Sequence, residues 1–155
     1  MSAQIDEFRI SSDPALLQPD WIISALHSTY WAGVRTAETI QKSIRGSLCY
    51  GIYSVKTSEQ VGFARVVTDQ ATFAWLCDVV IDPACRGVGL GKLLVSTILA
   101  DERLRGVTFH LGTRDAHGFY ERQGFARSKT MRRKPVSGEE EIPRSFRSNE
   151  PEFRS

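Results

Sequence analysis

The chain has 155 residues, of which 41% are hydrophobic, so it is long and apolar enough for one globular domain and is not a wholly disordered chain. It carries 20 basic and 18 acidic side chains, and this near balance argues against nucleic acid as its main partner. Its three cysteines include no CxxC pair, which excludes a disulfide framework and a zinc knuckle.

The hydrophobic pattern changes several times between the period of about 3.6 residues typical of helices and the period of about 2 typical of strands. Asp20 and Thr36 are each placed to cap a helix, and Gly46 is placed to end the second one. Residues 73–81 are almost continuously apolar, which indicates a strand in the middle of a sheet. In chain order, the pattern predicts a strand at 7–11, helices at 21–30 and 36–46, a hairpin of strands at 48–55 and 60–68, a strand at 73–81, a helix at 91–105, a strand at 107–111, a helix at 115–123 and a strand at 125–129.

This order, an antiparallel meander followed by βαβ units, indicates a mixed α/β fold around one central sheet. The composition changes near Pro135, where a segment with few apolar residues and no periodicity begins. We therefore expect one domain over residues 1–134 and a disordered tail over residues 135–155. The alternative for the tail is a docking peptide built on Phe146 and Phe153.

A glycine-rich turn joins the strand at 73–81 to the helix at 91–105, and its composition predicts an anion site. Glycines let the backbone approach a ligand, and the N-terminus of a helix attracts negative charge. Arg86 and Lys92 add two cations to the turn. A Walker A loop is excluded because the glycines are one residue too close and Leu93 replaces the magnesium-binding hydroxyl, and the dinucleotide GxGxxG spacing is absent as well. The alternative is a turn that merely connects strand to helix.

Two motifs, in this order along the chain, resemble the GNAT (Gcn5-related N-acetyltransferase) superfamily. Arg86-x-x-Gly89-x-Gly91 matches the acyl-CoA pyrophosphate loop of that family, R/Q-x-x-G-x-G/A. The segment AHGFYERQGF at 116–125 is similar to the family's A-x-x-[LF]-Y-x-x-x-G-F. The resemblance spans about residues 5–130. It implies a single-domain fold with a central, mostly antiparallel sheet, a parallel pair of strands splayed at the acyl-CoA site and about four flanking helices.

The resemblance also implies an activity, the transfer of an acetyl group from acetyl-CoA to a primary amine of a small molecule, peptide or protein by direct attack in a ternary complex. In this comparison the N–H of Val79 is the donor to the thioester carbonyl, the backbone of Ile81 pairs with the pantetheine arm, and Tyr120 is the general acid for the leaving thiolate. Thr113 departs from the asparagine that family members often carry there. The residues implied to bind acetyl-CoA are Val79, Ile81, Arg86, Gly87, Val88, Gly89, Leu90, Gly91, Lys92 and Thr113.

The sequence leaves open which residue acts as the general base. Where many family members carry a carboxylate or histidine on the fourth strand, this chain has Trp75 and Cys77. Asp78 is adjacent, but strand alternation sends it to the other face unless a bulge intervenes. A water chain is an equal alternative to any side chain. The further candidates are His27, Asp69, Asp115 and His117.

The acceptor amine is expected to bind between the helical N-terminal region and the sheet, against Tyr30, Trp31, Arg65 and Trp75, with His27 and Arg35 at the same helix end and in the loop that follows it. Arg65 either holds a carboxylate of the acceptor or pairs with Asp69 or Asp78. The alternative function, from another class, is a non-catalytic module that binds or senses acyl-CoA, in which Tyr120 is a packing aromatic.

The N-terminal residues lack the basic-then-apolar order of a secretory signal, and no apolar run approaches the roughly 18 residues of a membrane span. We therefore expect a cytoplasmic monomer or homodimer. Its expected partners are acetyl-CoA and an amine acceptor, with no nucleic acid, no membrane and no metal ion.

Overall fold

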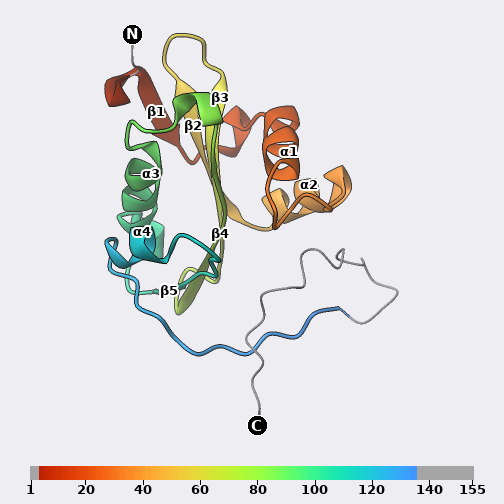
Figure 1. Ribbon diagram of the computed structural model, residues 1–155, viewed down its shortest axis with the longest axis vertical. Coiled ribbons are helices and arrows are strands. Elements are labelled where there is room, and N and C mark those ends of the chain that lie inside the picture. The colour runs from red at the N-terminus through yellow and green to blue at the C-terminus, as the bar shows by residue number, and fades with distance from the viewer. Residues whose placement is uncertain (1–3, 136–155) are drawn as a thin grey trace.

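The computed structural model describes residues 4–135, which form one five-stranded sheet with helices on both faces (Figure 1). The strands lie in the order in which they occur in the chain, and each neighbouring pair from β1 to β4 is antiparallel. β5 is parallel to β4. The mixed α/β class and the parallel pair are therefore confirmed. The strands are β1 Phe8–Ser11, β2 Leu48–Ser54, β3 Gln60–Thr68, β4 Phe73–Ile81 and β5 Thr108–His110.

The two faces of the sheet bury separate hydrophobic cores. The helices α1 (Pro19–His27) and α2 (Ala37–Arg45) cover one face, where Ile22, Leu26 and Phe63 pack together. The helices α3 (Leu90–Leu99) and α4 (His117–Glu121) lie on the opposite face (Figure 1), over a larger core of strand and α3 residues. Burial of each large apolar side chain contributes about 1.5–3 kcal/mol, so these two cores hold the helices to the sheet.

β4 and β5 separate after a short contact. Only Phe73–Trp75 of β4 pair with β5, so within residues 4–135 the half of β4 from Leu76 to Ile81 has no strand beside it on that side. The splay implied by the family resemblance is thus present. It leaves one edge of the central strand open along its C-terminal half, next to the glycine-rich turn.

The helix boundaries differ in part from those predicted. Thr36 caps α2 by accepting a hydrogen bond from the N–H of Thr39 at 3.1 Å, and Gly46 ends that helix, as predicted. α1 begins at Pro19, because proline is well suited to the first helical position, so Asp20 lies inside the first turn and is not the cap. α1 ends at His27 and not at residue 30. α3 ends at Leu99, and residues 102–104 form a separate short 3₁₀ turn capped by Asp101.

The predicted strand at 125–129 does not form. Phe125 packs its ring against those of Tyr120 and Phe109, but residues 126–130 are exposed and offer no apolar face to bury. The chain after α4 leaves the sheet along an extended path (Figure 1). Residues 136–155 lie outside the described part, and with them Phe146, Phe153 and nearly all of the expected tail. Among residues 4–135, no helix combines the length and the apolar composition that crossing a bilayer requires.

Candidate active site

Two adjoining clefts open beside the C-terminal half of β4. The glycine-loop cleft, of about 840 Å³, lies between the glycine-rich turn, the end of α1 and the start of α4. The arginine cleft, of about 570 Å³, lies between the loop after α1, β3, β4 and the segment before α4. The two clefts share a wall, so a ligand in one lies next to a ligand in the other. The shared residues are Tyr30, Trp31, Val79, Asp115 and Ala116.

The glycine-rich turn has the geometry of an anion site. Gly87 and Gly89 have φ of +88° and +89°, a conformation that side-chain-bearing residues rarely adopt. Gly89 is the residue before α3, and the first N–H groups of that helix have no acceptor within it. Arg86 and Lys92 are exposed along the cleft, and neither forms an ion pair with a residue in 4–135. The turn therefore offers amides, a helix N-terminus and two cations to one negatively charged group.

A β-bulge interrupts β4 beside this turn. Phe63 of β3 pairs with Val80, and Arg65 of β3 pairs with Cys77. Between these two pairs, Asp78 and Val79 of β4 lie opposite a single residue of β3, Ala64. Asp78 has φ of +55°, which is rare for a residue with a side chain and marks the extra residue. The bulge reverses the alternation beyond it. Asp78 is thereby carried to the face covered by α1 and α2, the exception that the sequence analysis left open.

Asp78 is buried, with a side chain only 1% exposed, and it organises the wall of the arginine cleft. Its Oδ2 accepts hydrogen bonds from Nε of Arg65 at 2.9 Å and Nη1 of Arg35 at 3.0 Å. Its Oδ1 accepts from Nη1 of Arg35 at 3.0 Å and from Nε1 of Trp31 at 3.1 Å. Both carboxylate oxygens of Asp78 are therefore engaged by the side chains of Arg35, Arg65 and Trp31, and Asp78 serves as a structural anion in the wall of the cleft.

The alternatives left open for Arg65 are decided by this geometry, since Arg65 pairs with Asp78 and also donates to Oγ of Ser47 at 3.1 Å. Asp69 instead closes the turn between β3 and β4. Hydrogen bonds from the Thr72 hydroxyl and from nearby backbone N–H groups hold the pKa of Asp69 well below its usual range. Burial raises the pKa of the Cys77 thiol, so it is uncharged near neutral pH.

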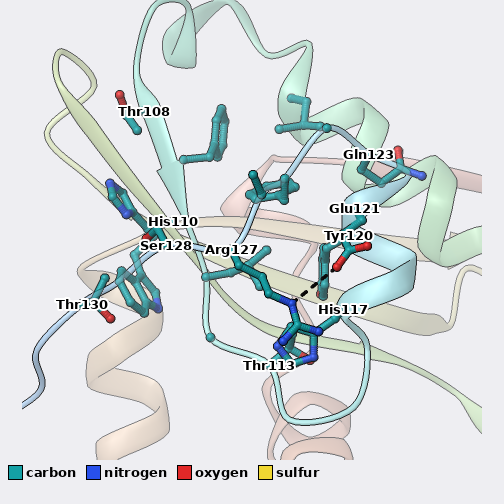
Figure 2. A pocket seen from close by; sticks show the side chains of 18 residues that line it. Thr108, His110, Thr113, His117, Tyr120, Glu121, Gln123, Arg127, Ser128 and Thr130 are labelled. Atoms are coloured by element: carbon teal, nitrogen blue, oxygen red, sulfur yellow. Dashed lines mark ion pairs between the residues drawn. The ribbon is translucent and has the colours of Figure 1, made fainter. Parts of the chain in front are cut away.

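Of the further candidates for a base, only Asp115 lines these two clefts. Nε2 of His27 is hydrogen-bonded to the carbonyl oxygen of Arg35 at 2.7 Å. His117 faces a third pocket, of about 690 Å³, between β5, α4 and the segment 125–130 (Figure 2). In that pocket Arg127 forms an ion pair with Glu121 at 3.7 Å, drawn as a dashed line in Figure 2.

Tyr120 lies on α4 and lines both the arginine cleft and the third pocket. Its ring packs edge-on against those of Phe119 and Phe125, with centroids 5.0 and 5.7 Å apart. Burial raises the pKa of the Tyr120 phenol, so it keeps its proton near neutral pH and can act as a donor. Val79 also lines the arginine cleft, so the predicted acid, Tyr120, and the predicted amide donor, Val79, lie in the wall of one cavity.

The structure gathers most of the residues that the sequence predicted. Val88 packs against the larger core and does not line either cleft, and the Thr113 hydroxyl accepts the N–H of Ala116 at 3.1 Å in the wall of the arginine cleft. The predicted cofactor residues that line the glycine-loop cleft are Val79, Ile81, Arg86, Gly87, Gly89, Leu90, Gly91 and Lys92. The predicted acceptor residues Tyr30, Trp31, Arg65 and Trp75 all line the arginine cleft.

Arg35, which the sequence placed near the acceptor, lines the arginine cleft, and so does Arg114, to which sequence reasoning assigned no site role. The guanidinium carbon of Arg114 lies 3.7 Å from the centre of the Tyr30 ring, stacked on its face. Both arginines lie in loops, where no periodicity marks a side chain as inward-facing. For Arg114 the only signal in the sequence was its position next to Thr113, a motif residue. Within residues 4–135, no three His, Cys, Asp or Glu side chains come together as a metal ion would require.

The profile of the acetyltransferase (GNAT) domain matches residues 46–127, which include both motifs and the bulged strand. The chain belongs to the GNAT family of acetyltransferases. Acetyl-CoA is the co-substrate of this family.

Relatives agree with this assignment. A GNAT-family protein of Xanthomonas campestris pv. campestris has a similar structure, with 38% identity, a TM-score of 0.78 and coverage of 83% of this chain and 93% of that one. FG08082 of Gibberella zeae, classed among the acetyltransferases, is 36% identical over 118 residues, which are 64% of this chain and 66% of that protein. Serotonin N-acetyltransferase 2 of Oryza sativa subsp. japonica is 37% identical over 76 residues, 47% of this chain and 38% of that protein. The chain therefore spans only part of the length of these two curated relatives.

Proposed function

We propose that the protein is an N-acetyltransferase that passes the acetyl group of acetyl-CoA directly to a primary amine while both substrates are bound. The observation that carries this proposal is the junction of the two clefts at Val79. One cleft has the amides and cations suited to a pyrophosphate, and the other contains a protonated Tyr120. A thioester that spans this junction would meet an amine from the arginine cleft.

Each part of the chain has a task in this proposal. The turn at 86–92 holds the pyrophosphate, and the open edge of β4 near Ile81 accepts the pantetheine arm as an added strand. Val79 has no partner residue on β3 or β5, which leaves its N–H suited to stabilising the oxyanion when the amine nitrogen attacks the thioester carbon. When the C–S bond breaks, Tyr120 gives its proton to the departing thiolate. The proton of the amine leaves to water or to Asp115.

A second candidate function has one observation in its favour. Trp75 and Cys77 occupy the strand positions expected for a base, and the neighbouring Asp78 is committed to two arginines. A module that binds acyl-CoA without catalysis needs no base and fits the same clefts.

One screen separates the two functions. The protein is incubated with acetyl-CoA and a panel of amines and lysine peptides, and the release of free CoA thiol is measured. An acetyltransferase releases thiol with at least one acceptor and yields the acetylated amine by mass spectrometry. If acetyl-CoA binds tightly and no member of the panel is acetylated, the binding module is the correct assignment.

A further inference from the structure

The arginine cleft carries more positive than negative charge. Four arginines and two aspartates line it, and one of the two aspartates, Asp78, is shared by Arg35 and Arg65. The other, Asp115, lies 3.9 Å from Arg114 in a pair whose side chains are 49% and 67% exposed, so solvent weakens that attraction. Among residues 4–135, the two aspartates therefore neutralise only part of the charge of Arg35, Arg65 and Arg114.

Two of these arginines have hydrogen-bond donors to offer. Arg35 uses only Nη1 on Asp78, and its Nε and Nη2 form no hydrogen bond with residues 4–135. Its side chain is 27% exposed. Arg114 forms no hydrogen bond within the same residues, and its stacking on Tyr30 covers one face of the guanidinium plane while leaving the edge open. A guanidinium edge with several N–H donors is suited to a carboxylate or a phosphate group.

The remaining wall is aromatic. Tyr30, Trp31, Trp75 and Tyr120 line the same cleft, and about 570 Å³ is the volume of a site for a small molecule. An acceptor that fills this space would place its amine near Val79 and Tyr120 and its other end near the arginines. The cations of the glycine loop, Arg86 and Lys92, line a different cleft, so the arginines of this one are not needed for the pyrophosphate.

From this arrangement, and resting on the proposed acetyl transfer, we infer that the acceptor is a small amine that carries an oxyanion, either a carboxylate or a phosphate. Arg35 and Arg114 bind that group. Asp78, which touches neither substrate in this scheme, is a positioning residue that holds Arg35 and Trp31 in the wall of the cleft. Neutral amines of the same shape lack the group that the two arginines bind.

The test uses pairs of amines that differ only in the anionic group, at saturating acetyl-CoA. Tryptophan is compared with tryptamine, phenylalanine with phenethylamine, and glucosamine 6-phosphate with glucosamine, by kcat/KM for thiol release. The anionic member of at least one pair is expected to be preferred by about 10-fold or more, because charge-assisted hydrogen bonds are the strong ones. The pair with the largest preference distinguishes a carboxylate from a phosphate. Equal rates for the two members of every pair, or preference for the neutral member, would overturn the inference while leaving acetyl transfer intact.

Two variants locate the effect. Arg114→Gln and Arg35→Gln should each raise KM for the anionic amine by about 10–100-fold, with little change for its neutral partner and in the affinity for acetyl-CoA. Arg114 is half-exposed, so its substitution keeps the test valid if the Arg35 variant unfolds. Arg122→Gln is the matched control, because it makes the same change of charge at the C-cap of α4, outside the three pockets. Equal losses in Arg122→Gln would show a general field effect and contradict the assigned site.

If no amine is acetylated, the proposed function fails and the inference is decided by binding alone. Calorimetry with the protein and CoA should then detect the anionic members of the pairs, with binding weakened in Arg114→Gln and unchanged in Arg122→Gln. Equal binding of anionic and neutral members, or no binding of either, would overturn it.

Discussion

Gln18 and Gln60 hold each other's backbone across 42 positions of the chain. The N–H of Gln18 donates to Oε1 of Gln60 at 2.9 Å, and the N–H of Gln60 donates to Oε1 of Gln18 at 3.0 Å. Their side-chain amides donate to the carbonyl oxygens of Ser58 and Gly62. This reciprocal pair fastens the start of α1 to the start of β3, and so fixes the helix that leads into both clefts.

Replacing Gln60 with alanine should lower the free energy of unfolding by about 1–3 kcal/mol, because Gln60 is 1% exposed and its loss leaves buried polar partners unsatisfied. Urea unfolding measures the change. Gln41→Ala is the control, since Gln41 is exposed on α2, and it should stay within about 0.5 kcal/mol of the parent. Equal stabilities of the two variants would mean that the pair contributes nothing.

Tyr120→Phe should reduce turnover by about 10²–10⁴-fold if the phenol is the general acid, while the melting temperature and the affinity for acetyl-CoA stay nearly constant. Tyr53→Phe is the matched control. Its hydroxyl is buried without a hydrogen-bond partner among residues 4–135 and lies in neither cleft, so turnover should not change.

The same residue predicts a pH dependence. The pKa of Tyr120 is raised above its ordinary value near 10, so the acid is intact at lower pH and is lost only as pH rises through that raised value. The pH–rate profile should therefore fall because of Tyr120 only above pH 10, as kcat/KM measured against pH would show. A fall of kcat/KM in the neutral pH range that disappears in Tyr120→Phe would contradict the raised pKa of the Tyr120 phenol.

Gly89→Ala and Gly106→Ala form a matched pair for the glycine loop. Both glycines have positive φ, +89° and +80°, and an added Cβ would meet no atom closer than 3.9 Å at either, so each variant should lose about 1–2 kcal/mol through backbone strain alone. Acetyl-CoA should raise the melting temperature of the parent and of Gly106→Ala, because it binds the folded state, and should raise that of Gly89→Ala much less. Equal stabilisation of the parent by ATP would contradict the assignment of the loop.

Asp101 links β2 to the turn after α3, because its Oδ2 accepts a hydrogen bond from the Tyr50 hydroxyl at 2.7 Å. Hydrogen bonds from Arg103, together with that from Tyr50, hold the pKa of Asp101 well below its usual range. A depressed pKa contributes stability that is fully present above the unfolded value near 4 and is lost gradually as the pH falls from there through the lower pKa of the folded state. Asp101→Asn should therefore cost about 1 kcal/mol at pH 7 and less at pH 2, as urea unfolding at the two pH values would show. An equal cost at both would exclude the charge as the cause.

The features that the sequence predicted correctly are those set by residues only a few positions apart in the chain. β3 and β4 have the predicted bounds, because apolar runs and turn residues act over a few positions. The turn before α3 was predictable for the same reason, since glycine takes positive φ without strain, as Gly87 and Gly89 do. The strand at 125–129 failed because a strand needs a partner, and Phe125 found its partners in two aromatic rings.

The pairing of Arg35 with Asp78 was the part of the arginine cleft that the sequence could not predict. Arg35 and Asp78 are 43 positions apart, and nothing in either neighbourhood indicates the other. Counting alternate residues along β4 also gives the wrong face for Asp78, because one additional residue with φ of +55° shifts every position after it. Such a shift is a property of the pairing of two strands and has no signature in one.

The extra residue on β4 separates what the fold requires from what the site requires. With Asp78 deleted, the remaining residues of β4 would alternate without interruption and match β3 one for one. The cores would keep their members, and the arginines would lose the carboxylate that fixes them. The same deletion would pair Val79 with Ala64 and take away its unpaired N–H. One additional residue in one strand therefore provides both the wall of the arginine cleft and the unpaired amide of Val79, without any change in either core.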